Sequence, residues 1–239
     1  MSNSTNPPMQ GTRGQLDSDG IRRIIIVVLQ TIIVAGIIFL AAGRLAYVWG
    51  WVYLGISLFG LLLNLTVMRS NPEVINERGR GTKGQKDWDK TLTSLLLLVG
   101  IVAFPLAGLD VRFGWSSVPL WLHLLSIPFV LFSTWIIFLV MKHNTYLAQG
   151  VRIQEERGHQ VATGGPYKYI RHPMYLAMSL SWATTPLLLG SWWMYIPSGL
   201  CIILFVVRTA LEDQTLQAEL PGYKAYAQQT RYRLLPGIW

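Results

Sequence analysis

The chain has 239 residues, of which 51% are apolar and only 13% charged, against roughly a quarter charged in an ordinary soluble domain. This composition excludes an ordinary soluble globular protein and indicates a polytopic membrane protein. The single cysteine, Cys201, lies inside an apolar run, which excludes a disulfide framework and a cysteine-based metal site. We therefore expect no bound metal.

Six apolar segments predict an all-α transmembrane bundle with about five to six membrane segments. Four of them, at 24–42, 46–68, 92–109 and 119–141, carry 18 to 23 residues without a charge, enough to cross a ~30 Å hydrocarbon core. Two shorter runs, 175–189 and 193–207, are separated by Gly190-Ser191-Trp192 and predict a short helical hairpin. This hairpin is expected to reach only part of the way across.

The segments predict three parts of the chain. Residues 1–20, rich in Ser, Asn, Pro and Gly, are expected to form a disordered tail. Residues 21–141 form a four-helix transmembrane part whose loop 69–90 is either a lid or a lipid-facing rim. Residues 142–239 contain the membrane hairpin 173–207 and a C-terminal helix, and the polar motifs of this part, described below with the family that they resemble, imply that it is the catalytic, cofactor-binding part.

The positive charges predict the orientation of the bundle. Eighteen of the 20 Lys and Arg residues lie in the N-terminal tail, the loops 69–90 and 142–173, and the C-terminal tail, which face the same compartment. The positive-inside rule places both termini in the cytosol, at a bacterial inner membrane or the endoplasmic reticulum. A basic rim on anionic lipids explains the net charge of +8, so we expect membrane lipids and no nucleic acid as partners.

The first segment equipped for chemistry runs from 158 to 175. Gly164-Gly165-Pro166 predicts a turn that lets a ligand approach the main chain, and Pro173 suits the first position of a helix. Arg171 and His172 then lie at the mouth of that helix. Free N–H groups there and the Arg171 fork predict an anion site, and His172 is expected to be a neutral hydrogen-bond partner.

The second segment continues from the last apolar run as a helix over 208–220, which Pro221-Gly222 ends. Arg208 and Glu212 lie one turn apart on it, so they are potential partners of one another. Because the hairpin returns this helix beside Pro173, we expect both side chains near His172 and Tyr175. Taken alone, the first segment has an interfacial anchor as its alternative interpretation, and the second has a solvated helix end. Because both segments lie at the same end of one hairpin, we favour a functional site.

Several motifs in these segments resemble a known family. They are Gly165-Pro166-Tyr167, Arg171-His172-Pro173-Met174-Tyr175, the acidic pair at 212–213, and Pro-Gly-Tyr-Lys-Ala-Tyr at 221–226. Together they resemble the isoprenylcysteine carboxyl methyltransferase family of integral membrane enzymes, a relative of the phospholipid N-methyltransferases, over about 142–236. Residues 71–74 and 77–79 also resemble its bacterial members. The chain departs from the pattern at Asp213, where a second Glu is common, and at Gly164, where Thr often stands.

The resemblance implies an enzyme that binds S-adenosylmethionine without a Rossmann fold and moves its methyl group to a lipophilic or membrane-accessible acceptor. The cofactor's carboxylate suits the helix mouth at His172, and its ammonium or ribose hydroxyls suit Glu212. The cofactor residues that it implies are His159, Gly165, Pro166, Tyr167, Arg171, His172, Pro173, Tyr175, Glu212 and Tyr223, with Tyr226 a looser match. The catalytic candidates are Arg208, Glu212 and Asn144, and Arg152 and Gln154 are further candidates near the acceptor.

The acceptor stays open among a prenylcysteine-like carboxylate, a phospholipid amine and a small thiol or phenol, and the oligomeric state is not predicted. Two other functions compete. One is an NADPH-dependent enzyme resembling the sterol reductases, which share a similar Arg-His-Pro region but have more membrane helices. The other is a non-catalytic lipid-binding protein, for which cofactor binding is absent.

Overall fold

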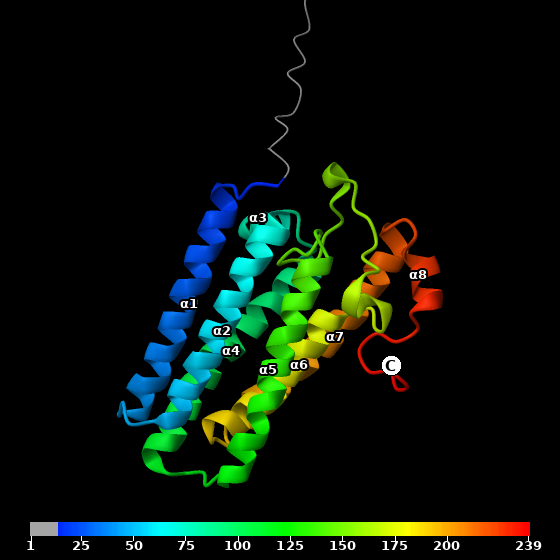
Figure 1. Cartoon of the computed structure of the whole chain (residues 1–239). Helices are drawn as coiled ribbons and strands as arrows, with labels where there is room; N and C mark the ends of the chain where they lie inside the picture. Colours follow the sequence, from blue (N-terminus) through cyan, green and yellow to red (C-terminus); the bar gives the residue numbers. More distant parts are fainter. Residues whose placement is uncertain (1–13) are drawn as a thin grey trace, which may run out of the picture.

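A computed structural model describes residues 14–239, and this part of the chain folds into helices without a strand (Figure 1). The predicted all-α class is confirmed. The α-helices are α1 (Ser18–Ala42), α2 (Val48–Ser70), α3 (Pro72–Gly79), α4 (Asp87–Phe113), α5 (Leu120–His143), α6 (Pro173–Leu189), α7 (Tyr195–Glu219) and α8 (Tyr223–Gln229). Two short 3-10 turns, η1 (Glu155–Arg157) and η2 (Gly165–Lys168), lie in the long connection between α5 and α6.

The long helices lie side by side and form the predicted bundle. Five of those in the described part, α1, α2, α4, α5 and α7, are long and apolar enough to cross a membrane, whereas α6 has 17 residues. Large apolar side chains point outward, with Leu40 79% and Leu97 64% exposed, as expected for surfaces that face lipid. Small residues lie where helices touch: a Cβ on Gly108 of α4 would lie 2.5 Å from that of Ala41 in α1.

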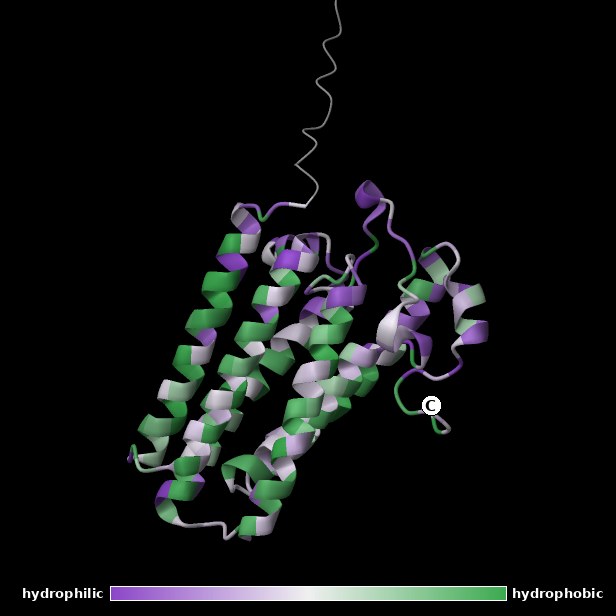
Figure 2. Ribbon diagram, in the orientation of Figure 1, coloured by the Kyte–Doolittle hydropathy of each residue, from purple (hydrophilic) through white to green (hydrophobic). Residues whose placement is uncertain are grey.

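The polar residues gather at one end of the bundle, which carries α3, the segment 144–172 and α8 (Figure 2). We call this the polar end. The connections 43–47, 114–119 and 190–194 lie at the opposite end (Figure 1). The connection 69–90 contains α3, which packs against α1. Asn76 fixes this contact, because its side chain bonds to the main chain of Gln15 and Asp17. The role of this connection as a lid or a lipid-facing rim stays a prediction.

The hairpin of α6 and α7 begins and ends as its sequence predicts. Pro173 occupies the first turn of α6, and Gly190 ends this helix with a positive φ of 73°. Helix α7 continues without a break through Arg208 and Glu212 to Glu219 and stops before Pro221-Gly222. The polar ends of α6 and α7 therefore lie side by side, which is what brings residues 37 to 42 positions apart into contact.

One boundary differs from the prediction. Helix α1 begins at Ser18, inside the tail predicted over 1–20, because the Asp17 side chain accepts a hydrogen bond from the backbone N–H of Gly20 and caps the helix. Residues 1–13 of that tail lie outside the described residues. The division into a transmembrane part and a catalytic part stays a prediction.

Candidate active site

A cavity of about 260 Å³ lies at the polar end, enclosed by α3, α5, α6, α7, α8 and the segment 144–172. This volume is near the lower end of the ~300–1,000 Å³ that small-molecule pockets usually have. Many residues of its wall were candidates from the sequence, although the wall is assembled from six separate parts of the chain. The predicted residues that line it are Asn144, Arg152, His159, Tyr167, Arg171, His172, Tyr175, Arg208, Glu212, Tyr223 and Tyr226.

Gly165, Pro166 and Pro173, which we expected to touch the cofactor, are not among the described residues that line the cavity. They shape its wall instead. Gly165 has a φ of 55°, and a Cβ there would lie 2.7 Å from Nδ1 of His143, so a side chain does not fit. This close turn carries Tyr167 into the cavity, where its hydroxyl accepts a hydrogen bond from the Asn144 amide at 2.8 Å.

Arg171 is held by Asp213, which corrects the prediction that its fork is open to a ligand carboxylate. Its Nε and Nη2 donate to the two oxygens of Asp213 at 2.7 and 3.1 Å. Its Nη1 donates to the carbonyls of Thr230 and Arg231. Burial alone would lower the pKa of Arg171, but the bonds to Asp213 raise it. Arg171 therefore ties α6, α7 and the C-terminal segment together.

Asp213 is the centre of this cluster, a role that sequence reasoning missed. It is fully buried and also accepts hydrogen bonds from Arg233 at 2.9 Å and from the Tyr223 hydroxyl at 3.0 Å. His172 places Nε2 at 3.3 Å from Asp213 and at 3.3 Å from the Tyr223 hydroxyl. Burial and the nearby Asp213 raise the pKa of Tyr223 far above its usual range, so its hydroxyl stays protonated and donates.

The predicted anion site at the mouth of α6 is also partly closed. The backbone N–H groups of Arg171 and His172 donate to the carbonyls of Tyr232 and Arg233 at 2.9 and 3.0 Å. Those of Tyr175 and Leu176 donate to the carbonyl of His172. The C-terminal segment thus accepts the hydrogen bonds of Arg171 and His172, the two residues before α6, which we had assigned to a ligand anion.

Tyr175 and Glu212 meet across the hairpin, as predicted. The Tyr175 hydroxyl donates to Oε2 of Glu212. No donor within residues 14–239 is bonded to the other carboxylate oxygen, and Glu212 lines the cavity. The Tyr175 ring also stacks beside the His172 ring, with centroids 6.0 Å apart. An aromatic face and a carboxylate are therefore presented together to whatever enters.

Arg208 does not pair with Glu212, contrary to one expectation. Its Nε lies 2.7 Å from Oδ1 of Asp89, and its Nη2 donates to Oδ2 at 3.0 Å and to the carbonyl of Gln149 at 2.8 Å. Its guanidinium also lies 5.4 Å from the centre of the Tyr175 ring. The side chain thus reaches the cavity in a fixed position.

Asp89 was not foreseen as part of the site. It is fully buried at the polar end of α4 and also accepts from the Gln85 amide at 2.8 Å and the backbone N–H of Val151 at 2.7 Å. An acidic residue so close to an apolar run was the available signal, because a buried carboxylate needs a partner.

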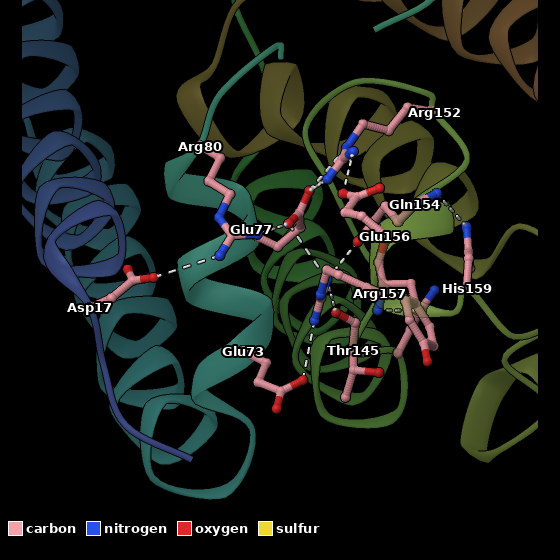
Figure 3. Close-up of polar contacts among 12 residues, drawn as sticks. Asp17, Glu73, Glu77, Arg80, Thr145, Arg152, Gln154, Glu156, Arg157 and His159 are labelled. Atoms are coloured by element: carbon pink, nitrogen blue, oxygen red, sulfur yellow. Dashed lines mark hydrogen bonds and ion pairs between the residues drawn. The ribbon is translucent and has the colours of Figure 1, made fainter. Parts of the chain in front are cut away.

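The segment 144–159 is held over α3 by arginines (Figure 3). Arg152 donates to Glu77 of α3 at 2.6 Å and to Glu156 at 2.8 Å, and Arg157 donates to Glu73 at 3.1 Å. Gln154, an expected acceptor residue, is fully buried within this segment and donates to the carbonyl of Tyr146 at 2.5 Å. It is absent from the described cavity wall and has a structural role.

His159 belongs to the cavity wall as an uncharged ring. It stacks on Tyr146 with ring centroids 4.7 Å apart, and its Nδ1 accepts from the backbone N–H of Gln154 at 3.3 Å. Burial, together with Arg157 and Arg152, lowers the pKa of His159 to about 4. His159 is therefore neutral at physiological pH. This agrees with its hydrogen bond, because Nδ1 can accept only in the neutral ring.

Aromatic hydroxyls complete the wall. The Tyr226 hydroxyl donates to the carbonyl of Tyr167 at 2.7 Å, and the rings of Tyr223 and Tyr226 lie 5.5 Å apart at 67°. No group of three His, Cys, Asp or Glu residues within the described chain has the arrangement of a metal site. Within this wall, the tyrosine rings and the carboxylate of Glu212 are the groups that can stabilise an organic cation.

The site region matches a known family. Residues 124–218 match the sequence model of the Isoprenylcysteine carboxyl methyltransferase (ICMT) family. The match contains α6 and most of α5 and α7, so it includes Tyr167, His172, Tyr175, Arg208 and Glu212. It begins earlier and ends earlier than the resemblance over 142–236, and it leaves out α3 and α8. No curated protein matches the chain.

Proposed function

We propose that this ICMT-like membrane methyltransferase takes its methyl group from S-adenosylmethionine and transfers it to a lipophilic acceptor that arrives from the membrane. The observation that supports this most is the contact of Tyr175 with Glu212 across the α6–α7 hairpin, inside the cavity and inside the family match. The proposal places the polar end in the cytosol, where this cofactor is available.

The residues of the cavity fit the cofactor's charges. S-adenosylmethionine supplies a methyl group on a cationic sulfonium, and a nucleophile displaces the sulfur in line. The rings of Tyr175 and Tyr167 lie on the cavity wall, where aromatic rings stabilise a cation, and the unoccupied oxygen of Glu212 is placed to accept hydrogen bonds from an ammonium or from ribose hydroxyls. Arg171 acts through Asp213: it positions His172 and Tyr223 and does not bind the ligand itself.

Positioning is the main task that such a transfer sets. Arg208, fixed by Asp89, and Asn144, bonded to Tyr167, are held rigidly at the cavity, so both are suited to orient the acceptor. The departing sulfur needs no acid, because the electron pair of the broken C–S bond returns to it. A carboxylate acceptor needs no base either, whereas a thiol, phenol or ammonium acceptor must also release a proton, for which water at the polar end is the proton acceptor.

A second cavity supports entry from the membrane. It measures about 200 Å³ and lies between α1, α2 and α5, lined mainly by apolar side chains such as Val27, Leu61 and Phe138. Ile137 of α5 lines both cavities, so one wall is shared between them. An apolar tail placed in the second cavity would bring its polar head towards the site.

The test is methyl transfer by the purified protein in lipid nanodiscs. With methyl-labelled S-adenosylmethionine and a panel of prenylcysteine-like, phospholipid-amine, thiol and phenol acceptors, we expect label in one class of organic-soluble product. Glu212→Gln should abolish most of it, and Glu219→Gln, at an exposed pair with Lys86, should not. Label in none of the four classes, together with quenching of intrinsic fluorescence by NADPH, would overturn the proposal in favour of a reductase.

A further inference from the structure

Arg78 is a cation on the cavity wall that no carboxylate within the described chain neutralises. It lies in the last turn of α3, outside the region that matches the family, and is half-buried. Among residues 14–239 its side chain makes one hydrogen bond, a long one of 3.5 Å from Nη1 to the carbonyl of Ala148. The cavity side of α3 therefore carries an unpaired guanidinium.

The neighbouring acids of α3 are committed elsewhere (Figure 3). Glu77, which is fully buried, binds Arg80 at 3.2 Å and Arg152 at 2.6 Å, and it lies 3.5 Å from Arg157. Glu73 binds Arg157. These residues form a closed network beside Arg78, and none of their charge is directed at it.

The remaining charges near Arg78 have the same sign or are already bonded. Burial lowers the pKa of Arg78 to about 9, and Arg23 of α1 and Arg208 of α7 add repulsion. Arg208 already has Asp89 as its partner. A guanidinium keeps its proton under these conditions, so the protein holds a half-buried cation without a carboxylate partner in the described chain, and an anion that binds it would lower the cost of this desolvation.

From these contacts we infer that Arg78 is the specificity-determining residue for the acceptor and binds an acidic group, carboxylate or phosphate, carried by a membrane amphiphile. The inference rests on the proposed function and names its substrate class. Position favours the acceptor over the cofactor as the ligand. Arg78 belongs to α3, which contacts α1 and α2, two of the helices that line the apolar second cavity, whereas Glu212 and Tyr223 belong to α7 and α8. Helix α3 lies beside α1 and α2 and away from α8 (Figure 1).

The test measures binding to the protein in nanodiscs of neutral phosphatidylcholine, saturated with S-adenosylhomocysteine. The probes are dodecanoate, dodecyl phosphate, the uncharged dodecanamide and inorganic phosphate. Arg78→Gln should weaken binding of the two anionic amphiphiles at least about tenfold, as the loss of a charge-assisted hydrogen bond does, and leave dodecanamide unchanged. Arg78→Lys should recover part of the loss. Arg80→Gln, two residues away on an exposed side chain, is the matched control.

The outcomes separate the two proposals. If S-adenosylhomocysteine does not bind the natural protein, the proposed function fails. If it binds, but Arg78→Gln keeps the preference for dodecanoate over dodecanamide, the inference alone fails. An equal loss of S-adenosylhomocysteine affinity in Arg78→Gln would overturn it too, because Arg78 would then serve the cofactor. If inorganic phosphate binds as tightly as dodecyl phosphate, the apolar tail contributes nothing to binding. This result would contradict the inference that the ligand is a membrane amphiphile.

Discussion

Asp213 and Asp89 are both fully buried, and each holds an arginine that the sequence made a site candidate, yet the two regions differ in what they leave free. Asp213 binds Arg171, Arg233 and the Tyr223 hydroxyl, and its arginines face protein groups. Asp89 binds one arginine, Arg208. Both Arg171 and Arg208 line the cavity, but all three side-chain nitrogens of Arg171 are bonded to protein groups, whereas no partner within residues 14–239 is bonded to Nη1 of Arg208. An arginine in a site motif can thus serve the fold or the ligand, and its carboxylate partner decides which.

The largest expected effect follows from removing Asp213. Asp213→Ala leaves Arg171 and Arg233 without their carboxylate in a buried place, which should cost about 3–5 kcal/mol of unfolding free energy. Thermal unfolding in detergent measures it. Glu219→Ala, which breaks only the exposed pair with Lys86, should cost no more than ~1 kcal/mol. Equal losses in the two variants would show that the Asp213 cluster is not structural.

Asp89→Asn should produce a smaller loss of stability and a different functional signature. A charge-assisted bond to Arg208 is weakened, at a cost of about 1.5–3 kcal/mol, and the guanidinium loses its fixed position at the cavity. We expect methyl transfer to fall further than the affinity for S-adenosylhomocysteine. An equal fall of methyl transfer and of S-adenosylhomocysteine affinity in the folded variant would mean that Arg208 acts on the cofactor. The proposed role of Arg208 in orienting the acceptor would then be wrong.

Filling the second cavity should weaken binding of the acceptor and leave binding of the cofactor unchanged. Gly60 of α2 lines that cavity, and a Cβ there would lie 3.4 Å from Thr134, so Gly60→Leu extends into the space. The KM for an acceptor with a long apolar tail should rise about tenfold, equivalent to ~1.4 kcal/mol, while cofactor affinity holds. Gly55→Leu, on the same helix with open space around it, is the control. An unchanged KM would exclude this entry route.

The smallest effect is the pH dependence of the 144–159 segment. The pKa of His159 is lowered to about 4 in the folded protein, against about 6.5 for a histidine in an unfolded chain, so its contribution to stability is complete above about pH 6.5 and is lost as the pH falls towards 4. At about pH 5.5 the loss should be about 1 kcal/mol, allowing for the partial exposure of the ring. Hydrogen exchange at the Gln154 amide measures it. His159→Asn should remove this pH dependence; if it persists, another group causes it.

The fold was predictable where its signals are local. Runs of apolar residues mark the long helices, and Pro173, Gly190 and Pro221-Gly222 mark the ends of the hairpin, because these residues restrict or free their own backbone. The placement of Tyr175 beside Glu212 followed from the hairpin alone. Helix α3 was missed because it has only eight residues, half of them polar or charged, and packs against α1, which lies far away in the sequence.

The partners of the arginines were not predictable, because they come from distant parts of the chain. Arg208 lies 119 residues from Asp89, and nothing near Arg208 distinguishes that partner from Glu212, one turn away. The same holds for Gln154, whose burial depends on how the segment 144–159 folds over α3. Sequence reasoning thus identified the residue types at the site, and tertiary contacts decided which of them face the cavity.

The most direct test of the proposed cofactor site is calorimetric titration of the purified protein with S-adenosylhomocysteine. We expect one binding event, which Glu212→Ala weakens at least about tenfold through the loss of its carboxylate and which Glu219→Ala leaves unchanged. Absence of binding to the natural protein, or an affinity that neither Glu212→Ala nor His172→Ala disturbs, would contradict the proposed site.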